Sequence, residues 1–112
     1  GFKQGIDYLW NGTPAIQVWC EKLTSWLYNN VGVANIKDGY NLDGSSPGSN
    51  HNIAHVGSLA VCASANTQQI VDAYVGEAAK LTDNYWYGDY LGNLYLLAVS
   101  GNMWNPDIVK KK

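Results

Sequence analysis

Arginine is absent from this sequence, and charged residues of every kind are scarce. They make up 14% of the 112 residues, against about 25% in a typical soluble domain. The seven lysines are scattered, apart from a run of three at 110–112, and form no basic patch suited to nucleic acid. Because hydrophobic residues reach 46%, the chain has much to bury and few charges for its outside. We therefore expect further protein to cover part of its surface.

Long hydrophobic runs are missing as well. None approaches the roughly 20 apolar residues that cross a bilayer, so no membrane span is expected. The front of the chain carries neither a starting methionine nor a signal peptide, as in a mature, processed or excised segment. The length allows one domain at most.

Cysteine occurs only at Cys20 and Cys62, which is too few for a disulfide framework. Both residues lie within apolar helical patterns. Two buried free thiols are the expectation, with a single bridge between them as the alternative.

No segment alternates apolar and polar residues for long enough to form a strand. The apolar residues recur instead at helical spacing. The pattern predicts an all-α fold of antiparallel helical hairpins packed side by side. Helices are expected at residues 2–10, 14–30, 52–64, from a cap at Asn66 or Thr67 to about 82, and 86–100.

Two segments fall outside these helices. Residues 33–51 form a long loop rich in glycine, serine and asparagine, and loops of this length are usually functional or mobile. An ordered turn is expected within it at residues 39–45. Residues 107–112 are expected to be a solvated tail.

Several kinds of catalytic centre find no support. His51 and His55 have the i, i+4 spacing of metal ligands, but no glutamate lies between them and no cysteine pair joins them. We expect His51 in the loop, His55 hydrogen-bonded within its helix, and no metal or cofactor. No Gly-x-Ser-x-Gly motif is present.

Two carboxylates lie among aromatic residues, where a pKa could be tuned or a sugar hydroxyl bound. Asp7 is expected to cap or hydrogen-bond a neighbouring helix. For Asp89 that role and contact with a sugar are both left open.

Aromatic residues give the clearest signal, because five tryptophans and eight tyrosines accompany a single phenylalanine. Rings with a polar group can stack on the apolar face of a pyranose while polar neighbours bind its hydroxyls. We expect Trp19, Trp26 and Tyr95 to belong to the core. Trp86, Tyr87 and Tyr40, at a helix start or in the loop, are expected to contact a ligand. The apolar run after Trp86 predicts a buried helix.

The motifs follow one another in a recognisable order: IDYLWNG at 6–12, a tryptophan-rich helix, DGYNLDGS at 38–45, a helix of small residues, and YWYGDYLGNLYLLAVSGNMWNP at 85–106. This order resembles the C-terminal part of glycoside hydrolase family eight, which contains endo-β-1,4-glucanases, chitosanases, lichenases and xylanases. The family pattern ends in two aromatics, any residue, Asp, an apolar helix, Ser-Gly-Asn, an aromatic and Pro. The resemblance covers nearly the whole chain.

The resemblance implies the last third of an (α/α)6 barrel, so that residues 1–112 are a single partial domain. It implies a secreted, inverting hydrolase of β-1,4-linked polysaccharide, with cellulose or a related β-glucan as the leading substrate. The acid and base of such an enzyme stand roughly 6.5–9.5 Å apart.

Both catalytic positions of the family lie upstream of Gly1, which leaves no catalytic residue in this chain. Trp86, Tyr87 and Asp89 would then line the substrate groove. The remainder of the barrel is a possible partner as a separate chain, and neither nucleic acid nor membrane is expected. The alternative is a stand-alone, non-catalytic helical module that binds sugar or has a structural role.

Overall fold

The computed structural model describes residues 1–82 and 84–106, and this part of the chain is helical without any strand. The predicted all-α fold is thus confirmed. Four of the five predicted helices have nearly the expected bounds, whereas α4 ends at Ala78 rather than near residue 82. The elements are α1 (Phe2–Asn11), α2 (Pro14–Asn30), the short 3-10 turn η1 (Val33–Asn35), α3 (Ile53–Ala63), α4 (Gln68–Ala78) and α5 (Trp86–Val99).

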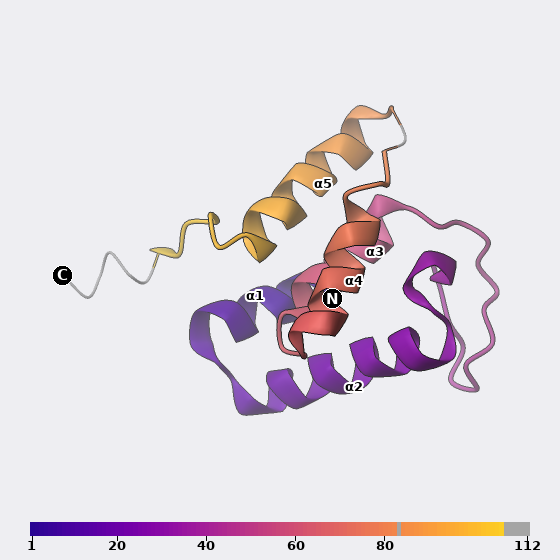
Figure 1. Ribbon diagram of the computed structural model, residues 1–112, viewed down its shortest axis with the longest axis horizontal. Coiled ribbons are helices and arrows are strands. Elements are labelled where there is room, and N and C mark those ends of the chain that lie inside the picture. The colour runs from indigo at the N-terminus through magenta and orange to yellow at the C-terminus, as the bar shows by residue number, and fades with distance from the viewer. Residues whose placement is uncertain (83, 107–112) are drawn as a thin grey trace.

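Helix α3 is the centre of the molecule and contacts all four other α-helices. In Figure 1, α2 lies along one edge and α5 along the opposite edge, with α3 and α4 between them. Most of α3 is buried, but Ala54, His55, Ser58 and Leu59 are only half-buried and share one face. Residues 52–64 are small and apolar on every side, which predicts a helix buried on all its faces, and this prediction is only partly correct.

Glycines let two helices approach α3 closely. A Cβ placed on Gly5 of α1 would lie 2.6 Å from the backbone carbonyl carbon of Val61. A Cβ on Gly57 of α3 would collide with the ring of Tyr95 in α5. The small residues of the sequence therefore set the distances between α3 and its neighbours.

The predicted core positions Trp19 and Trp26 are wrong. Their side chains are 43% and 39% exposed, and the buried face of α2 consists of Cys20, Thr24 and Leu27. The small side chains of α3 bring the two helices close together, and such a contact favours narrow residues over an indole. Both tryptophans lie seven residues apart on one flank of α2, beside the buried face.

Cys20 and Cys62 form a disulfide that joins α2 to α3, so the free-thiol expectation is wrong. Their Cα atoms lie 5.2 Å apart, which is within the usual range for a bridge. Both side chains are fully buried. Sequence spacing carries no information on this pairing, because it depends on how the two helices cross.

Hydrogen bonds tie α4 and its preceding turn to α2. The hydroxyl of Tyr74 donates to the carbonyl oxygen of Thr24 at 3.0 Å, deep in the core. The side-chain amide of Asn66 donates to Thr24 Oγ1 and Ser25 Oγ. Burial raises the pKa of Tyr74, which therefore stays a hydrogen-bond donor.

The helices occupy two layers, consistent with part of an (α/α)6 barrel. Helices α1, α3 and α5 pack side by side, α2 covers α1 and α3, and α4 covers α3. That residues 1–112 make one partial domain stays a prediction, and the predicted tail at 107–112 lies outside the described residues. No helix of the described chain is both long and apolar enough to cross a membrane.

Candidate functional site

Four exposed aromatic residues gather at the start of α5, and we call Tyr85, Trp86, Tyr87 and Tyr90 the ring cluster. The chain turns into this helix through Asn84, whose φ of 54° is in the left-handed region. Trp86 is 77% exposed, and its ring lies 5.8 Å from that of Tyr87 in an edge-on arrangement. Large rings left open to solvent in this way are suited to contact with a ligand.

The rest of α5 holds the ring cluster at the edge of the molecule. Gly88, Gly92, Tyr95 and Ala98 are buried and form the face against α3, as expected for Tyr95. Leu97 on another face is half-exposed, so the expectation of an entirely buried helix is wrong. One packed face fixes the helix while its first turn projects beyond α3.

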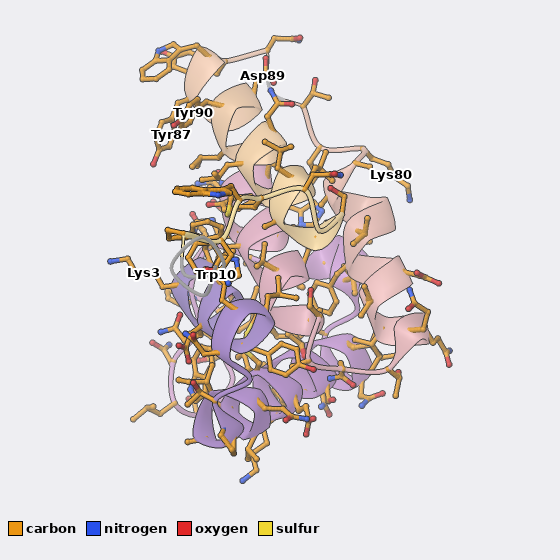
Figure 2. All side chains as sticks on the ribbon, turned by 90° about the vertical axis from the view of Figure 1, so that its left-hand side faces the viewer. Lys3, Trp10, Lys80, Tyr87, Asp89 and Tyr90 are labelled. Atoms are coloured by element: carbon orange, nitrogen blue, oxygen red, sulfur yellow. A yellow bond between two sulfur atoms is a disulfide. The ribbon has the colours of Figure 1, made fainter. Side chains whose placement is uncertain are left out.

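Asp89 lies apart from its aromatic neighbours. Figure 2 shows Tyr87 and Tyr90 leaving one side of α5 and Asp89 leaving the other, where Lys80 and α4 lie. Asp89 lines a hollow of about 280 Å³ together with Leu81 and Thr82 from the segment after α4. Contact between Asp89 and the substrate stays a prediction. A ligand that touches both Asp89 and the ring cluster must extend round the start of α5.

Tyr40 also lies on a different part of the surface. Its ring meets Trp26 edge-on, with centroids 5.9 Å apart, and its hydroxyl accepts a hydrogen bond from the backbone N–H of Lys37 at 2.9 Å. Tyr40 lines two hollows, and neither includes a residue of α5. The structure therefore pairs Tyr40 with a tryptophan that we expected in the core.

The long loop that carries Tyr40 is closed by hydrogen bonds across its base. Asp38 accepts from the side-chain amide of Asn50 at 2.9 Å and from its backbone N–H. The Asn50 amide lowers the pKa of Asp38 and keeps this carboxylate ionised. Further along, the ring of His51 lies within hydrogen-bond distance of the Ile36 carbonyl oxygen and of Glu77 on α4.

Glu77 on α4 forms a hydrogen bond with His51 of the long loop, and the stability that this bond provides depends on pH. The hydrogen bond from His51 is the main cause of its lowered pKa, and Lys80 adds to it. A carboxyl with a lowered folded-state pKa stabilises the fold above its ordinary value of 4.5, and this contribution is lost as the pH falls further.

We expect Glu77→Gln to lower the free energy of unfolding at pH 6 by about 1–2 kcal/mol. The gap from the wild type should shrink on going to pH 3, because the wild-type carboxyl then gains a proton. Urea unfolding at both pH values measures this gap. A gap that stays constant between the two would contradict the assignment.

Three further predictions concern the polar residues His51, His55 and Asp7. His51 lies in the loop and His55 bonds the side chain of Asn52 within the first turn of α3, as expected. Asp7 accepts from Asn11 within its own helix, and a hydrogen bond from the side chain of Thr13, the residue that precedes α2, agrees with the expected contact to a neighbouring helix. Within the described residues, no three His, Cys, Asp or Glu side chains gather as a metal site would require.

The carboxyls with shifted pKa values have the wrong environment for a general acid. Asp7, Asp38, Asp43 and Glu77 all have pKa values below the ordinary range, and a hydrogen bond from a side chain is the main cause in each. A general acid needs a raised pKa so that it keeps its proton near neutral pH. These four groups are held ionised instead.

Comparison with known proteins finds that the chain is similar to three proteins named as endoglucanases. It is 35% identical over 108 residues to Endoglucanase C of Ruminiclostridium cellulolyticum and 34% identical over 108 residues to Endoglucanase 2 of Ruminiclostridium josui. It is 31% identical over 111 residues to Endoglucanase A of Acetivibrio thermocellus. No protein-family model matches the chain.

These matches cover 93–95% of this chain but only 23% of each relative. The chain thus spans about a quarter of the length of the curated relatives it matches. The resemblance to enzymes of the endoglucanase type is confirmed, and it extends over nearly all of the sequence.

Proposed function

We propose that this chain is a segment of an inverting family-eight glycoside hydrolase that cuts β-1,4-linked polysaccharide, with cellulose or a related β-glucan as substrate. The segment contributes aromatic side chains to the substrate groove. Trp86 and Tyr87 stack on sugar rings, while Asp89 and Tyr40 are further substrate contacts. The observation that carries this proposal is the exposed ring cluster at the end of a firmly packed helix, in a chain similar to three endoglucanases.

The acid and the base of the reaction belong to the part of the enzyme ahead of Gly1. The four carboxyls with lowered pKa values support this for the acid, because each is held ionised by a neighbouring side chain. In the inverting reaction one carboxylic acid protonates the leaving oxygen, and one carboxylate activates water on the other face of the sugar. This chain alone is then inactive.

The rest of the barrel is the natural partner of this segment. Helices α1 and α3 carry an outer helix each, whereas α5 lacks an outer partner among the described residues. An open hollow of about 500 Å³ runs between α4 and α5, with Val71, Val75, Leu96 and Leu97 among its lining. A helix from the remainder of the enzyme would cover these apolar side chains.

A secreted location is consistent with the disulfide in this chain. Disulfides form and persist in oxidising environments outside the cytosol. The buried Cys20–Cys62 bridge therefore supports export of the enzyme.

A stand-alone helical module that binds sugar without cutting it is the second candidate. It is favoured by the way four helices and a disulfide enclose α3, since such a core can fold without further chain. The ring cluster binds sugar in both cases. The two candidates differ in whether the chain works alone or as part of a barrel.

Trp86→Ala tests the sugar-binding role that both candidates share. We expect the chain to bind cellohexaose, and the variant to bind it at least about tenfold more weakly, because truncating an aromatic anchor commonly costs about 1.4 kcal/mol or more. Titration calorimetry measures both affinities. Trp104→Ala is the matched control, since Trp104 is similarly exposed at 67% but lies outside the ring cluster. Equal affinities for all three proteins would rule out the role of the ring cluster.

A further inference from the structure

We propose a second carbohydrate-contact site in the cleft that Trp26 and Tyr40 line, which takes one pyranose unit of a β-linked glucan. The inference rests on the proposed function for its class of ligand but concerns a different surface from the ring cluster. The cleft is a hollow of about 330 Å³ lined by α2 and the long loop. Its lining residues are Leu23, Trp26, Tyr40, Asn41, Leu42, Asp43 and Gly44.

The cleft has an aromatic wall that remains open to solvent. Trp26 keeps 39% of its surface exposed even though Tyr40 meets it edge-on. Gly44 lies close to the far edge of the indole, since a Cβ at that position would be 3.0 Å from Trp26 Cζ2. With its φ of 86°, Gly44 has the left-handed conformation that glycine adopts without strain. The loop therefore frames the indole without covering it.

Hydrogen bonds hold the loop in this shape. The backbone N–H of Asn41 donates to the Ser45 carbonyl oxygen at 2.8 Å, and that of Gly44 donates to the Asn41 carbonyl oxygen at 3.0 Å. Asp38 and Asn50 close the base of the loop, as described above. A site that is already formed loses less conformational entropy when it binds a ligand.

Two oxygen atoms at the rim are available to sugar hydroxyls. Oδ1 of Asp43 accepts from both the backbone N–H and the hydroxyl of Ser45, and no other residue of the described chain donates to Oδ2. Asn41 donates its amide to Ser45 Oγ at 3.0 Å, and its Oδ1 likewise accepts no bond from the described residues. The Ser45 hydroxyl lowers the pKa of Asp43, so this acceptor stays ionised.

This combination matches the surface of a glucan chain. A β-linked pyranose presents axial C–H groups on its faces and hydroxyls around its edge. An aromatic wall with hydrogen-bond acceptors at its rim binds both features together. A purely apolar partner would remove water from the Asp43 carboxylate without donating a hydrogen bond to it, which is costly.

Fluorine NMR of the whole chain labelled with 5-fluorotryptophan tests the site. Each of the five tryptophans gives one resonance, assigned by its loss in the corresponding Trp→Phe variant, and cellotriose is the probe. We expect saturable shifts of the Trp26 and Trp86 resonances. Trp19 is the matched control, because it lies on the same flank of α2 with 43% exposure but lines none of the hollows described.

The outcomes separate this site from the ring cluster. A shift of Trp86 alone overturns the cleft and leaves the proposed function standing. A shift of Trp26 alone supports the cleft and removes the role of Trp86. Equal shifts of Trp19 and Trp26 would mean that any exposed indole binds the sugar non-specifically, which overturns the cleft as a site. No shift of any resonance overturns both sites.

In a second variant, Asp43→Asn and Asn41→Ala are combined on the loop rim, away from the core. We expect these changes to weaken the cellotriose response of Trp26 by about tenfold and to leave that of Trp86 unchanged. An unaltered Trp26 response would show that the rim takes no part in binding, contrary to the proposal.

Discussion

Replacing Cys20 and Cys62 together by alanine is expected to lower the free energy of unfolding by about 4 kcal/mol. The two cysteines are 42 residues apart in the sequence, and opening a loop of this length restores about that much chain entropy to the unfolded state. Alanine leaves no buried polar group behind. Since small domains are stable by about 5–15 kcal/mol, this loss is a large part of the total. Urea unfolding followed by circular dichroism measures it.

A reducing agent gives an independent version of the same experiment. Treating the wild-type protein with dithiothreitol should bring its unfolding midpoint close to that of the double variant. The variant itself should not respond to the reagent. Identical midpoints for the untreated wild type and the variant would contradict a stabilising bridge.

Gly5→Ala should produce the second large effect. The added methyl group would lie 2.6 Å from the carbonyl carbon of Val61 and 2.7 Å from the backbone nitrogen of Cys62. A backbone cannot swing aside as a side-chain end can, so α1 must move away from α3. We expect the free energy of unfolding to fall by about 2–3 kcal/mol, as in other overpacked cores.

Gly76→Ala is the matched control for this variant. Gly76 also lies within a helix, but a methyl group there would meet nothing within 4 Å. Alanine stabilises an open helical position by about 0.5–1 kcal/mol relative to glycine. The two substitutions should therefore have opposite signs in the same unfolding assay. A loss of stability in both would show that the Gly5 contact is not the cause.

Local sequence signals were sufficient to predict the helices. The break at 12–13, with Thr13 before Pro14, separates α1 from α2, and the turn before Gln68 separates α3 from α4. These signals depend on neighbouring residues, so a single sequence carries them. The early end of α4 at Ala78 was missed because the segment after it retains a helical pattern of residues.

Contacts between helices were less predictable. The sequence predicted Trp19 and Trp26 in the core, yet the close crossing of α2 with α3 buries Cys20 and Thr24 instead. The disulfide and the bond between His51 and Glu77 join residues far apart in the sequence. No local pattern encodes such pairs, because they depend on the three-dimensional arrangement.

The sequence also predicted only part of the candidate site. The exposure of Trp86 and Tyr87 follows from their place at a helix start, which the sequence shows. The separation of Asp89 from Tyr87 follows from the helical repeat, because side chains two residues apart leave a helix on nearly opposite sides. Which of these sides faces α4 depends on how α5 packs on α3 through buried residues such as Gly92. The partnership of Tyr40 with Trp26 depends on how the loop folds back.

The bridge between Cys20 and Cys62 also makes part of the chain a closed covalent ring. The ring contains the whole loop between α2 and α3, including its exposed turn at Leu42 and Asp43. Exposed loop tips are preferred sites of proteolytic cleavage. A protease that cuts the loop there opens one peptide bond but releases no fragment, because the sulfur bridge still joins the two pieces. The protein can thus be nicked at its longest loop and remain one molecule.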